Sequence, residues 1–429
     1  MKKHLLALSA AAVLLAPQAV GAEGFSINEW SAEGFAMGGA RMFAENDAAN
    51  MAYNPASLTK IKGEVAKISA TYISPHGKYK VTPVLGVDSV VTAPTTGHNR
   101  VHPAWAPGMY YVKQINDKEW LGFGSYARFG NSCQFEPGSY PGFNNTSSKL
   151  NGMSIGVNYA KKLDSKWSAS LGAEVNYAWL QIDRTMPTPL PGSVQVEGES
   201  YALGWNAAVN YEFDKKNEMG IVYRSAVNHS MEANVRDNGY MYNKGFEGIT
   251  DAYGCVTLPE SVMIGYGHKF NDKTRVELNG TWTRWSRFDA FNMTYSGANM
   301  TFDGTTLPAF PHPDARNWKD GWRYAIGIEH KLSDKYSLLG GIAYDESAIP
   351  DYPEIGADFM VPTGTRTTFT IGTQYHDEKQ TLALSIGYMK VGDLSIEGDS
   401  APGNNTFYNS AKMHDSYTKL VSISYQYNF

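Results

Sequence analysis

The sequence is poor in cysteine, with only Cys133 and Cys255 among its 429 residues. Two cysteines cannot form the disulfide framework of a small secreted domain, and their spacing fits no metal-binding motif. They predict either two unrelated thiols or one disulfide between loops. The net charge is −5 and basic residues form no cluster, which argues against a nucleic-acid partner. We therefore expect no cofactor, no metal and no nucleic acid.

Long apolar runs are also lacking. Beyond the first residues, no segment approaches the ~18 to 20 continuous apolar residues that a transmembrane helix needs. Lys2 and Lys3, the apolar run from Leu5 to Pro17 and the small residues before Glu23 predict a signal peptide over residues 1–22. No Ser/Pro tract or charge block marks a linker in the rest of the chain, so one large exported domain is expected.

Catalytic motifs are missing as well. His229, Ser230 and Asp237 lie near one another in the sequence, but they match no nucleophile, zinc-protease or paired-carboxylate spacing. Scattered polar residues of this kind usually belong to a solvated surface. The sequence thus predicts no catalytic residue and a protein that is not an enzyme.

Residues 23–60 differ from the rest of the chain. Gly34, Gly38 and Gly39 interrupt any strand pattern, and a short helix must end before Pro55 because the residue preceding a proline avoids the helical region. A compact, glycine-rich segment ahead of a long β-rich chain can be accommodated inside a closed barrel. We predict that residues 23–60 form a small N-terminal hatch and that residues 61–429 form the barrel.

The remaining chain shows an alternation with a period of two residues, which is typical of β-strands with two different faces. One face is apolar and the other is small or polar. The alternation is clear at residues 153–159, 167–179, 201–211, 382–388 and 421–429. A soluble β-sandwich would alternate too, so strand length and aromatic placement decide between the two folds.

Trp167 and Trp179 share the apolar face of one such segment, twelve residues apart. At ~3.3 Å per residue and a tilt of ~40°, they are separated by roughly 30 Å along a barrel axis. This separation is close to the ~25 Å lipid-facing band of outer-membrane barrels, which aromatic girdles border on both sides. The last strand ends on Phe429, as the assembly signal of such barrels does. These features favour a transmembrane β-barrel.

Short polar turns recur along the chain and allow the strands to be counted. They lie at residues 116–118, 164–166, 214–217, 271–273, 333–335 and 377–379. The intervals of about 45 to 60 residues suit two strands and a longer outer loop. Six turns on the periplasmic side, with the first and last strands ending there too, predict a 14-stranded antiparallel transmembrane β-barrel plugged by the hatch.

Several short motifs, in order along the whole chain, resemble the FadL family of outer-membrane transporters for long-chain fatty acids and other hydrophobic compounds. They are Gly24 to Glu29, Asn54-Pro55-Ala56, Tyr223-Arg224-Ser225, Leu258-Pro259-Glu260, Trp285-Ser286 and Trp318-Lys319-Asp320. The resemblance implies a plugged fourteen-stranded barrel in the bacterial outer membrane. It also implies passive transport by way of a lumen pocket and a lateral exit beside a kink in the third strand.

The resemblance assigns the kink to Phe129 and Gly130, in a third strand that runs from Trp120 towards Cys133. A glycine inside a strand agrees with a bend. Asn54, Pro55 and Ala56 are expected to form a rigid turn between hatch and barrel, because Pro55 fixes its own φ and restricts Asn54. We expect this triplet to contact the kink.

The cargo site is expected where the inner face of the strand from Trp167 turns apolar, at Leu180 and Ile182, just before Arg184. A hydrocarbon tail would lose water against the apolar residues, and the guanidinium would bind a carboxylate. By resemblance, Arg184 holds the head group and Phe25 of the hatch reaches the pocket. Arg316 could supply a second basic ligand.

The sequence leaves some points open. The loop after Arg184, of about fifteen residues before a strand near Ser200, is shorter than the partly helical loop typical of the family. An aromatic-hydrocarbon channel of the same fold and a general aqueous porin are the alternative functions. The expected partners are hydrophobic small molecules, outer-membrane lipid and lipopolysaccharide, and the barrel-assembly machinery, for a monomeric protein.

Overall fold

The computed structural model describes residues 24–397 and 407–429, apart from gaps at 240–245, 248, 289, 297–298, 303–304, 309–311 and 351–356. The predicted signal peptide, residues 1–22, lies outside the described residues. Across these ranges, no helix is both long and apolar enough to cross a membrane.

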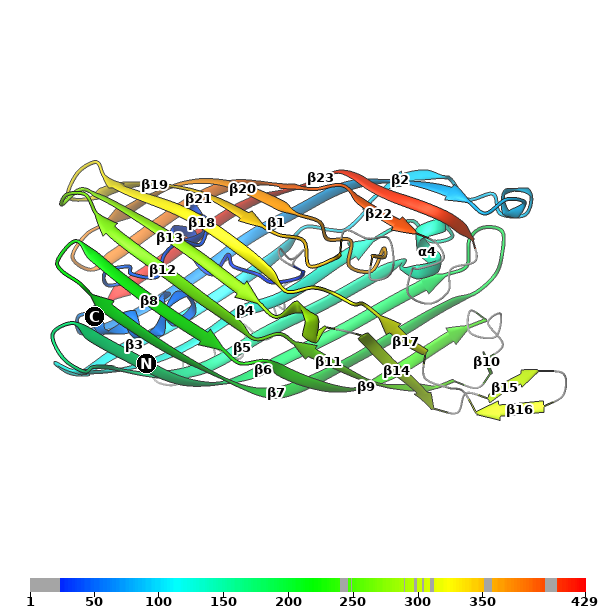
Figure 1. Cartoon of the computed structure of the whole chain (residues 1–429), viewed down its shortest axis with the longest axis horizontal. Coiled ribbons are helices and arrows are strands. Elements are labelled where there is room, and N and C mark those ends of the chain that lie inside the picture. The colour runs from blue at the N-terminus through cyan, green and yellow to red at the C-terminus, as the bar shows by residue number, and fades with distance from the viewer. Residues whose placement is uncertain are drawn as a thin grey trace.

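The described strands close into one barrel of fourteen antiparallel strands (Figure 1), as the sequence predicted. Closure is made by β1, which pairs with β3 on one side and with the last strand, β23, on the other. Four of the fourteen are interrupted and carry two labels. The barrel strands are β1 (Glu64–Pro83), β3 (Ala104–Asn116), β4 (Glu119–Gln134), β5 (Ser147–Lys162), β6 (Trp167–Thr185), β7 (Ser193–Glu212), β8 (Asn217–Arg224) with β9 (Val227–Asn238), β11 (Asp251–Leu258) with β12 (Ser261–Lys269), β13 (Thr274–Thr283) with β14 (Ala290–Ser296), β17 (His312–Ala315) with β18 (Gly321–Lys331), β19 (Tyr336–Asp345), β20 (Arg366–His376), β21 (Gln380–Val391) and β23 (Tyr408–Asn428).

All six predicted short turns connect neighbouring strands at one end of the barrel, on the left in Figure 1. We call this end the turn end and the opposite end the loop end. The longer connections at the loop end carry the remaining short elements. These are η2 (Val87–Ser89), β2 (Thr96–His98), α4 (Tyr140–Asn144), β10 (Phe246–Glu247), β15 (Asn299–Phe302), β16 (Thr305–Pro308) and β22 (Leu394–Glu397). The 3-10 helix η4 (Trp285–Arg287) lies instead in the interruption between β13 and β14.

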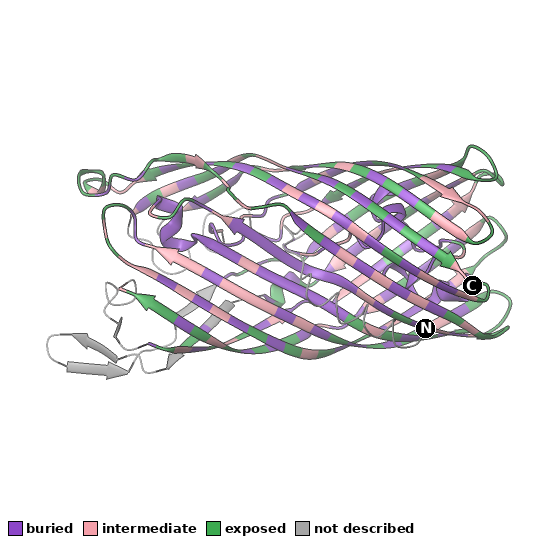
Figure 2. Ribbon diagram, turned by 180° about the vertical axis from the view of Figure 1, so that it is seen from behind, coloured by how far each residue is buried: buried purple, intermediate pink, exposed green. Residues whose placement is uncertain are grey.

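The predicted alternation gives the barrel an apolar outer face, visible as alternating exposed and buried residues along many of its strands (Figure 2). On β6, Trp167, Leu171 and Val175 are exposed, while Ser168 and Asn176 are buried. The same parity holds on β21 and β23. An apolar surface that faces outward is the reverse of a soluble sandwich and suits a lipid environment.

Towards the loop end, this polarity reverses. On β7, Leu203 is exposed on the outer face and Asn206 is buried on the inner face. Nearer the loop end, the exposed residue is Glu199, and the buried ones are Val194 and Val196. A strand of 20 residues tilted by ~40° rises roughly 50 Å, about twice the ~25 Å apolar band. The barrel therefore extends beyond the membrane band, and its extension encloses an apolar interior.

The N-terminal segment, residues 24–61, lies inside the barrel near the turn end, in dark blue in Figure 1. It contains α2 (Ala32–Ala36), α3 (Asn50–Tyr53) and the 3-10 helix η1 (Pro55–Lys60). Ser31 caps α2 by accepting a hydrogen bond from the Gly34 amide, and Asn54 caps η1 by accepting one from the Ala56 amide. Each of these two caps pairs an amide at the beginning of a short helix inside the lumen.

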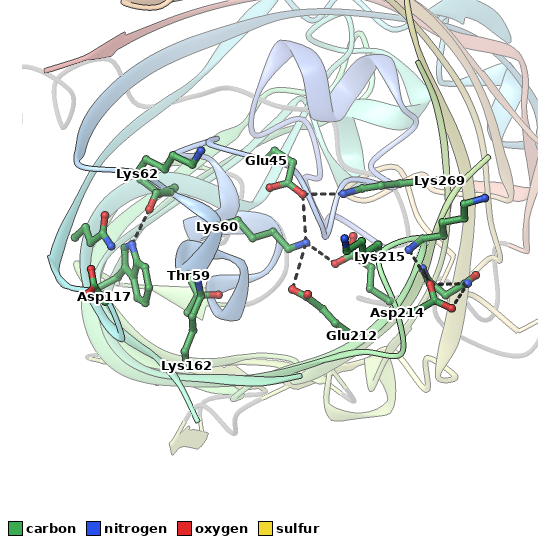
Figure 3. Close-up of a pocket in the computed structure, with 16 residues that line it drawn as sticks. Glu45, Thr59, Lys60, Lys62, Asp117, Lys162, Glu212, Asp214, Lys215 and Lys269 are labelled. Carbon is green, nitrogen blue, oxygen red and sulfur yellow. Dashed lines mark hydrogen bonds and ion pairs between the residues drawn. The ribbon is translucent and has the colours of Figure 1, made fainter. Parts of the chain in front are cut away.

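Ion pairs fix this segment to the barrel wall. At the turn end, Lys60 pairs with Glu218 and lies 3.6 Å from Glu45, which also pairs with Lys269 at 3.0 Å (Figure 3). These residues line a polar cavity of about 610 Å³ that opens at the turn end. Deeper in the lumen, Lys67 of β1 bonds Glu33 and Asp47 at 2.9 and 2.7 Å. Each of these segment residues has a charged partner on the wall, and the buried carboxylates of Glu33 and Asp47 require one.

Close backbone contact also seats the segment. A Cβ atom at Gly341 of β19 would lie 2.2 Å from the carbonyl carbon of Met37, whereas one at Gly340 would lie 3.6 Å from its nearest neighbour. We expect Gly341→Ala to displace the segment, because packed backbone cannot yield as a flexible side chain can. The variant should keep a folded, heat-modifiable barrel but lose protease resistance in residues 24–61. Gly340→Ala is the control, and equal protease resistance of the two variants would contradict this description.

Candidate functional site

The third barrel strand, β4, bends into the lumen. Its alternating burial stops at Tyr126, and every residue from Tyr126 to Cys133 is buried. The β4–β5 register shifts between Ala127 and Phe129, so that Arg128 is an inserted residue. Insertion of one residue bends a strand and disrupts its ladder. The bend lies at the predicted place beside Gly130, and the role of Phe129 and Gly130 in gating stays a prediction.

The bend separates β4 from its neighbour β3. Among the described residues, the β3–β4 ladder ends at Gly108 and Tyr126, so β4 continues towards the loop end without β3 beside it. The N-terminal segment takes the place of the missing strand. The Ile27 amide donates to the Arg128 carbonyl and the Gly130 amide donates to the Phe25 carbonyl, both at 2.8 Å. The start of the segment thus covers the open edge of β4.

Asn54 and Ala56 make hydrogen bonds to the wall at β7 and β6 rather than at the bend, and the expected contact of the triplet with the bend stays a prediction. The Asn54 amide donates to Asn210 Oδ1 of β7 at 2.6 Å, and the Ala56 carbonyl accepts from Ser168 of β6. The triplet lies where α3 ends and η1 begins, on the side of the segment nearer the turn end. Residues at the very start of the segment, rather than its end, meet the bend.

Phe25 lies at the centre of an aromatic cluster inside the barrel. Its ring is 4.8 Å from Trp285, 5.2 Å from Phe288, 5.9 Å from Phe129 and 6.0 Å from Trp318. Trp285 and Phe288 come from the interruption between β13 and β14, and Trp318 from the one between β17 and β18. The breaks in these strands therefore turn three large rings inward, onto the first described residues of the chain.

This cluster continues into the apolar interior of the loop end. Ile182 is 2 % exposed and belongs to the same buried cluster as Phe25, and Leu180 packs against it. Arg184 follows two residues later on β6 with the same parity and is half-buried. The structure thus brings the predicted Leu180, Ile182 and Phe25 into one apolar cluster near Arg184, while their binding role is untested.

The loop after Arg184 is shorter than predicted. The strand β6 ends at Thr185 and β7 begins at Ser193, so that residues 186–192 form the connection. The next strand was expected near Ser200, but β7 begins earlier, because Val194 and Val196 continue its alternation with apolar side chains inside and polar ones outside.

Arg316 is fully buried beside the aromatic cluster. Its Nη1 atom lies 2.7 Å from Asp358 Oδ2, and its guanidinium lies 6.0 Å from the centre of the Phe288 ring. Its Nε atom and the indole nitrogen of Trp285 have no hydrogen-bond partner within the part of the chain that the structure describes. Two buried donors without acceptors suit a ligand that carries an acceptor group.

Cys133 is buried within β4 and Cys255 is exposed on β11, and both are free thiols. Of the two possibilities that the sequence left open, the structure has unrelated thiols. Cys133 lies inside the third strand rather than after it, because the strand continues past its bend.

No role was expected for Trp285, Phe288 or Trp318. Trp285 and Trp318 stood within the motifs of the family resemblance, but their inward direction depends on strand interruptions. A period-two pattern does not reveal such breaks. The signal that could have found them was the disturbed alternation in the runs 284–288 and 316–320.

Comparison with known proteins agrees with this architecture. A family model described as "Outer membrane protein transport protein (OMPP1/FadL/TodX)" matches residues 12–429. The long-chain fatty acid transport protein of Escherichia coli K12 is 26 % identical over 430 residues, covering 89 % of this chain and 91 % of that protein. Outer membrane protein P1 of Haemophilus influenzae is 24 % identical over 438 residues, covering 90 % of both chains.

Solved structures share the fold. A crystal structure of a Pseudomonas aeruginosa FadL homologue matches with a TM-score of 0.79 and 16 % identity, over 95 % of this chain and all of that one. The toluene transporter TodX of P. putida matches with a TM-score of 0.66 and 15 % identity, over 94 % and 99 % of the two chains.

The family model spans nearly the whole chain, and its description is that of transport proteins, which confirms that the protein is not an enzyme. The barrel and the relatives also confirm the predicted location in the outer membrane. The chain therefore belongs to the OMPP1/FadL/TodX family of outer-membrane transport proteins.

Proposed function

We propose that this protein carries hydrophobic compounds passively across the outer membrane, with long-chain fatty acids as the first candidate. The observation that carries the proposal is the apolar interior around Phe25 and Ile182, which lies beside the open edge of β4. An apolar interior binds a molecule that gains free energy by leaving water, at ~25 cal/mol per Å² of buried apolar surface. The open strand edge gives that molecule a route other than the turn end.

The cations near the apolar cluster favour a cargo with a carboxylate. Arginine can bind a carboxylate through two parallel hydrogen bonds. Arg184 is half-buried and follows Ile182 by two residues on the same face of β6, and Arg316 is buried beside the rings of the cluster, where it pairs with Asp358. We therefore assign the head group to Arg184 and a supporting role to Arg316, whose Nε faces no acceptor among the described residues.

The names of relatives support two cargo classes. The Escherichia coli relative is named for long-chain fatty acids, and a structural neighbour is a toluene transporter. Aromatic hydrocarbons are thus the alternative, and the rings around Phe25 would suit them. An aqueous porin fits less well, because the N-terminal segment fills the lumen near the turn end with buried side chains.

The proposed route begins at the loop end. Cargo reaches the apolar cluster and displaces Phe25, which serves as the gate. Displacement of Phe25 would also break the hydrogen bonds that residues 25 and 27 make with β4. The freed gap between β3 and β4 would then release the cargo sideways into the membrane. Residues 31–60 would stay in place as the hatch, because their ion pairs bind them to the wall.

The remaining partners follow from the location. Outer-membrane lipid and lipopolysaccharide would surround the apolar band, and the barrel-assembly machinery would insert the chain, with Phe429 at the end of its last strand. We propose that the protein works as a monomer, since each barrel contains its own lumen and gate.

The Arg184 assignment is tested by replacing it with alanine. We expect oleate binding to weaken by about 1.5–3 kcal/mol, the range for a hydrogen bond to a charged group, while a neutral hydrocarbon of similar length loses little. Equilibrium binding to the purified protein in detergent measures both. Arg236→Ala is the matched control, because Arg236 is an exposed cation of β9 that bonds Gln195. Unchanged oleate binding by the Arg184 variant would refute the assignment, and a parent that binds only toluene-like compounds would favour the aromatic alternative.

The gating role of Phe25 is tested by Phe25→Ala. The change removes the ring that packs against Trp285 and Phe288, and loss of a buried phenylalanine ring costs about 3–5 kcal/mol. We expect a bound fluorescent fatty acid to dissociate faster, as measured by stopped-flow displacement. Phe43→Ala is the control, since Phe43 is equally buried but belongs to a separate cluster. Identical dissociation rates for the two variants would contradict a gating role for Phe25.

A further inference from the structure

Arg128, the residue inserted at the β4 bend, makes a buried ion pair across the inner wall. Its Nη1 atom lies 2.6 Å from Oε1 of Glu174, and both side chains are almost fully buried. Glu174 lies on β6, so the pair crosses over β5. The side chain of an inserted residue can point into the lumen or out of the barrel. The carboxylate of Glu174 holds the Arg128 side chain towards the lumen.

The neighbouring strands make room for this pair. Glu174 is flanked in register by Gly156 of β5 and Gly204 of β7. A Cβ atom at Gly156 would lie 3.1 Å from Glu174 Cβ, and one at Gly204 would lie 3.2 Å from its Cγ. Two glycines at these positions therefore leave space beside the Glu174 side chain, which reaches the guanidinium across one whole strand.

The pair is linked to the N-terminal segment. Tyr126 donates to Glu174 at 3.4 Å, and Arg224 of β8 donates to the Tyr126 hydroxyl at 2.7 Å and to the carbonyl of Ala52. From the segment, Trp30 Nε1 donates to the Ala127 carbonyl at 2.6 Å. Hydrogen bonds thus hold the backbone just before the inserted residue, and the ion pair holds the inserted residue itself.

Side-chain packing beside the bend is incomplete and does not replace these hydrogen bonds. A small cavity of about 30 Å³ lies under the bend, lined by Ser26, Ile27, Arg128, Phe129 and Arg224 among others. A buried ion pair adds little net stability compared with an apolar pair of the same size, because desolvation of the charges offsets their attraction. A contribution to folding stability therefore does not explain why a charged pair lies at this place. The fixed geometry that the ion pair gives to the inserted residue does explain it.

We infer that Arg128 and Glu174 are positioning residues for cargo release, which hold β4 in the bent position that keeps its edge away from β3. This inference rests on the proposed lateral exit. Neither residue needs to touch the cargo. Their effect is on the shape of the gap and on the strand edge that residues 25–27 cover.

The test is Glu174→Gln, which keeps the shape of the side chain but removes its charge. We expect oleate uptake by cells to fall about tenfold, because the buried guanidinium of Arg128 is no longer held in place without the carboxylate. Equilibrium binding of oleate in detergent should stay close to the parent value. Amide hydrogen exchange should rise within residues 126–134 and not elsewhere in the barrel. Asp345→Asn is the matched control, because Asp345 is an equally buried acid that pairs with Arg323 at 3.1 Å on the β18–β19 wall.

Two more variants separate positioning from folding. Arg128→Lys should restore part of the uptake that Arg128→Gln loses, because lysine keeps the charge opposite Glu174. The double change Arg128→Met with Glu174→Leu removes both charges of the pair, so the barrel should fold but take up oleate poorly. Uptake and local exchange equal to those of Asp345→Asn would overturn the inference. If the parent neither binds nor takes up hydrophobic compounds, the proposed function fails, and the exchange data still decide whether the pair holds the bend.

Discussion

The structure depends on the requirement that backbone N–H and C=O groups find partners where lipid offers none. The barrel meets this requirement by closing β1 against β23. At one place the ladder between neighbouring strands stops, beyond Gly108 of β3 and Tyr126 of β4. There the N-terminal segment supplies the missing partners through residues 25 and 27. The start of the segment and the wall are therefore joined by these hydrogen bonds, and movement of the proposed gate would expose the edge of β4.

A second constraint is the reversal of polarity along the barrel. In the membrane band the wall is apolar outside and polar inside, and the charged N-terminal segment binds to that polar inner face, as Lys67 does with Glu33 and Asp47. Towards the loop end the wall is polar outside, as at Glu199, and apolar inside, as at Val194 and Val196. The lumen thus has an inner face with ion pairs near the turn end and an apolar interior towards the loop end, and Phe25 lies where the apolar interior begins. This division explains how one segment can be anchored by ion pairs at residues 31–60, while its first residues are held by aromatic contacts and by the backbone hydrogen bonds with β4.

Much of this architecture could be predicted from the sequence, because strand alternation and short turns are local properties. The outward facing of Trp167 and Leu171, the six turns and the strand number follow from such patterns and agree with the structure. The contacts of Asn54 and the inward direction of Trp285 and Trp318 could not be predicted, since they depend on how a folded segment seats against distant strands. The pairing of Arg128 with Glu174 was hidden for the same reason: the two residues are 46 positions apart and meet only because β4 bends over β5.

The proposed lateral exit can be tested most directly by closing the gap between β3 and β4. If the ladder continued beyond Gly108 and Tyr126, Ala104 would face Gly130. Cysteines at these two positions, in a chain with Cys133 and Cys255 replaced by serine, can be joined by a short thiol reagent that reduction cleaves. The account predicts that cross-linking blocks oleate uptake, leaves oleate binding intact and is reversed by reduction. Full uptake by a completely cross-linked barrel would contradict it.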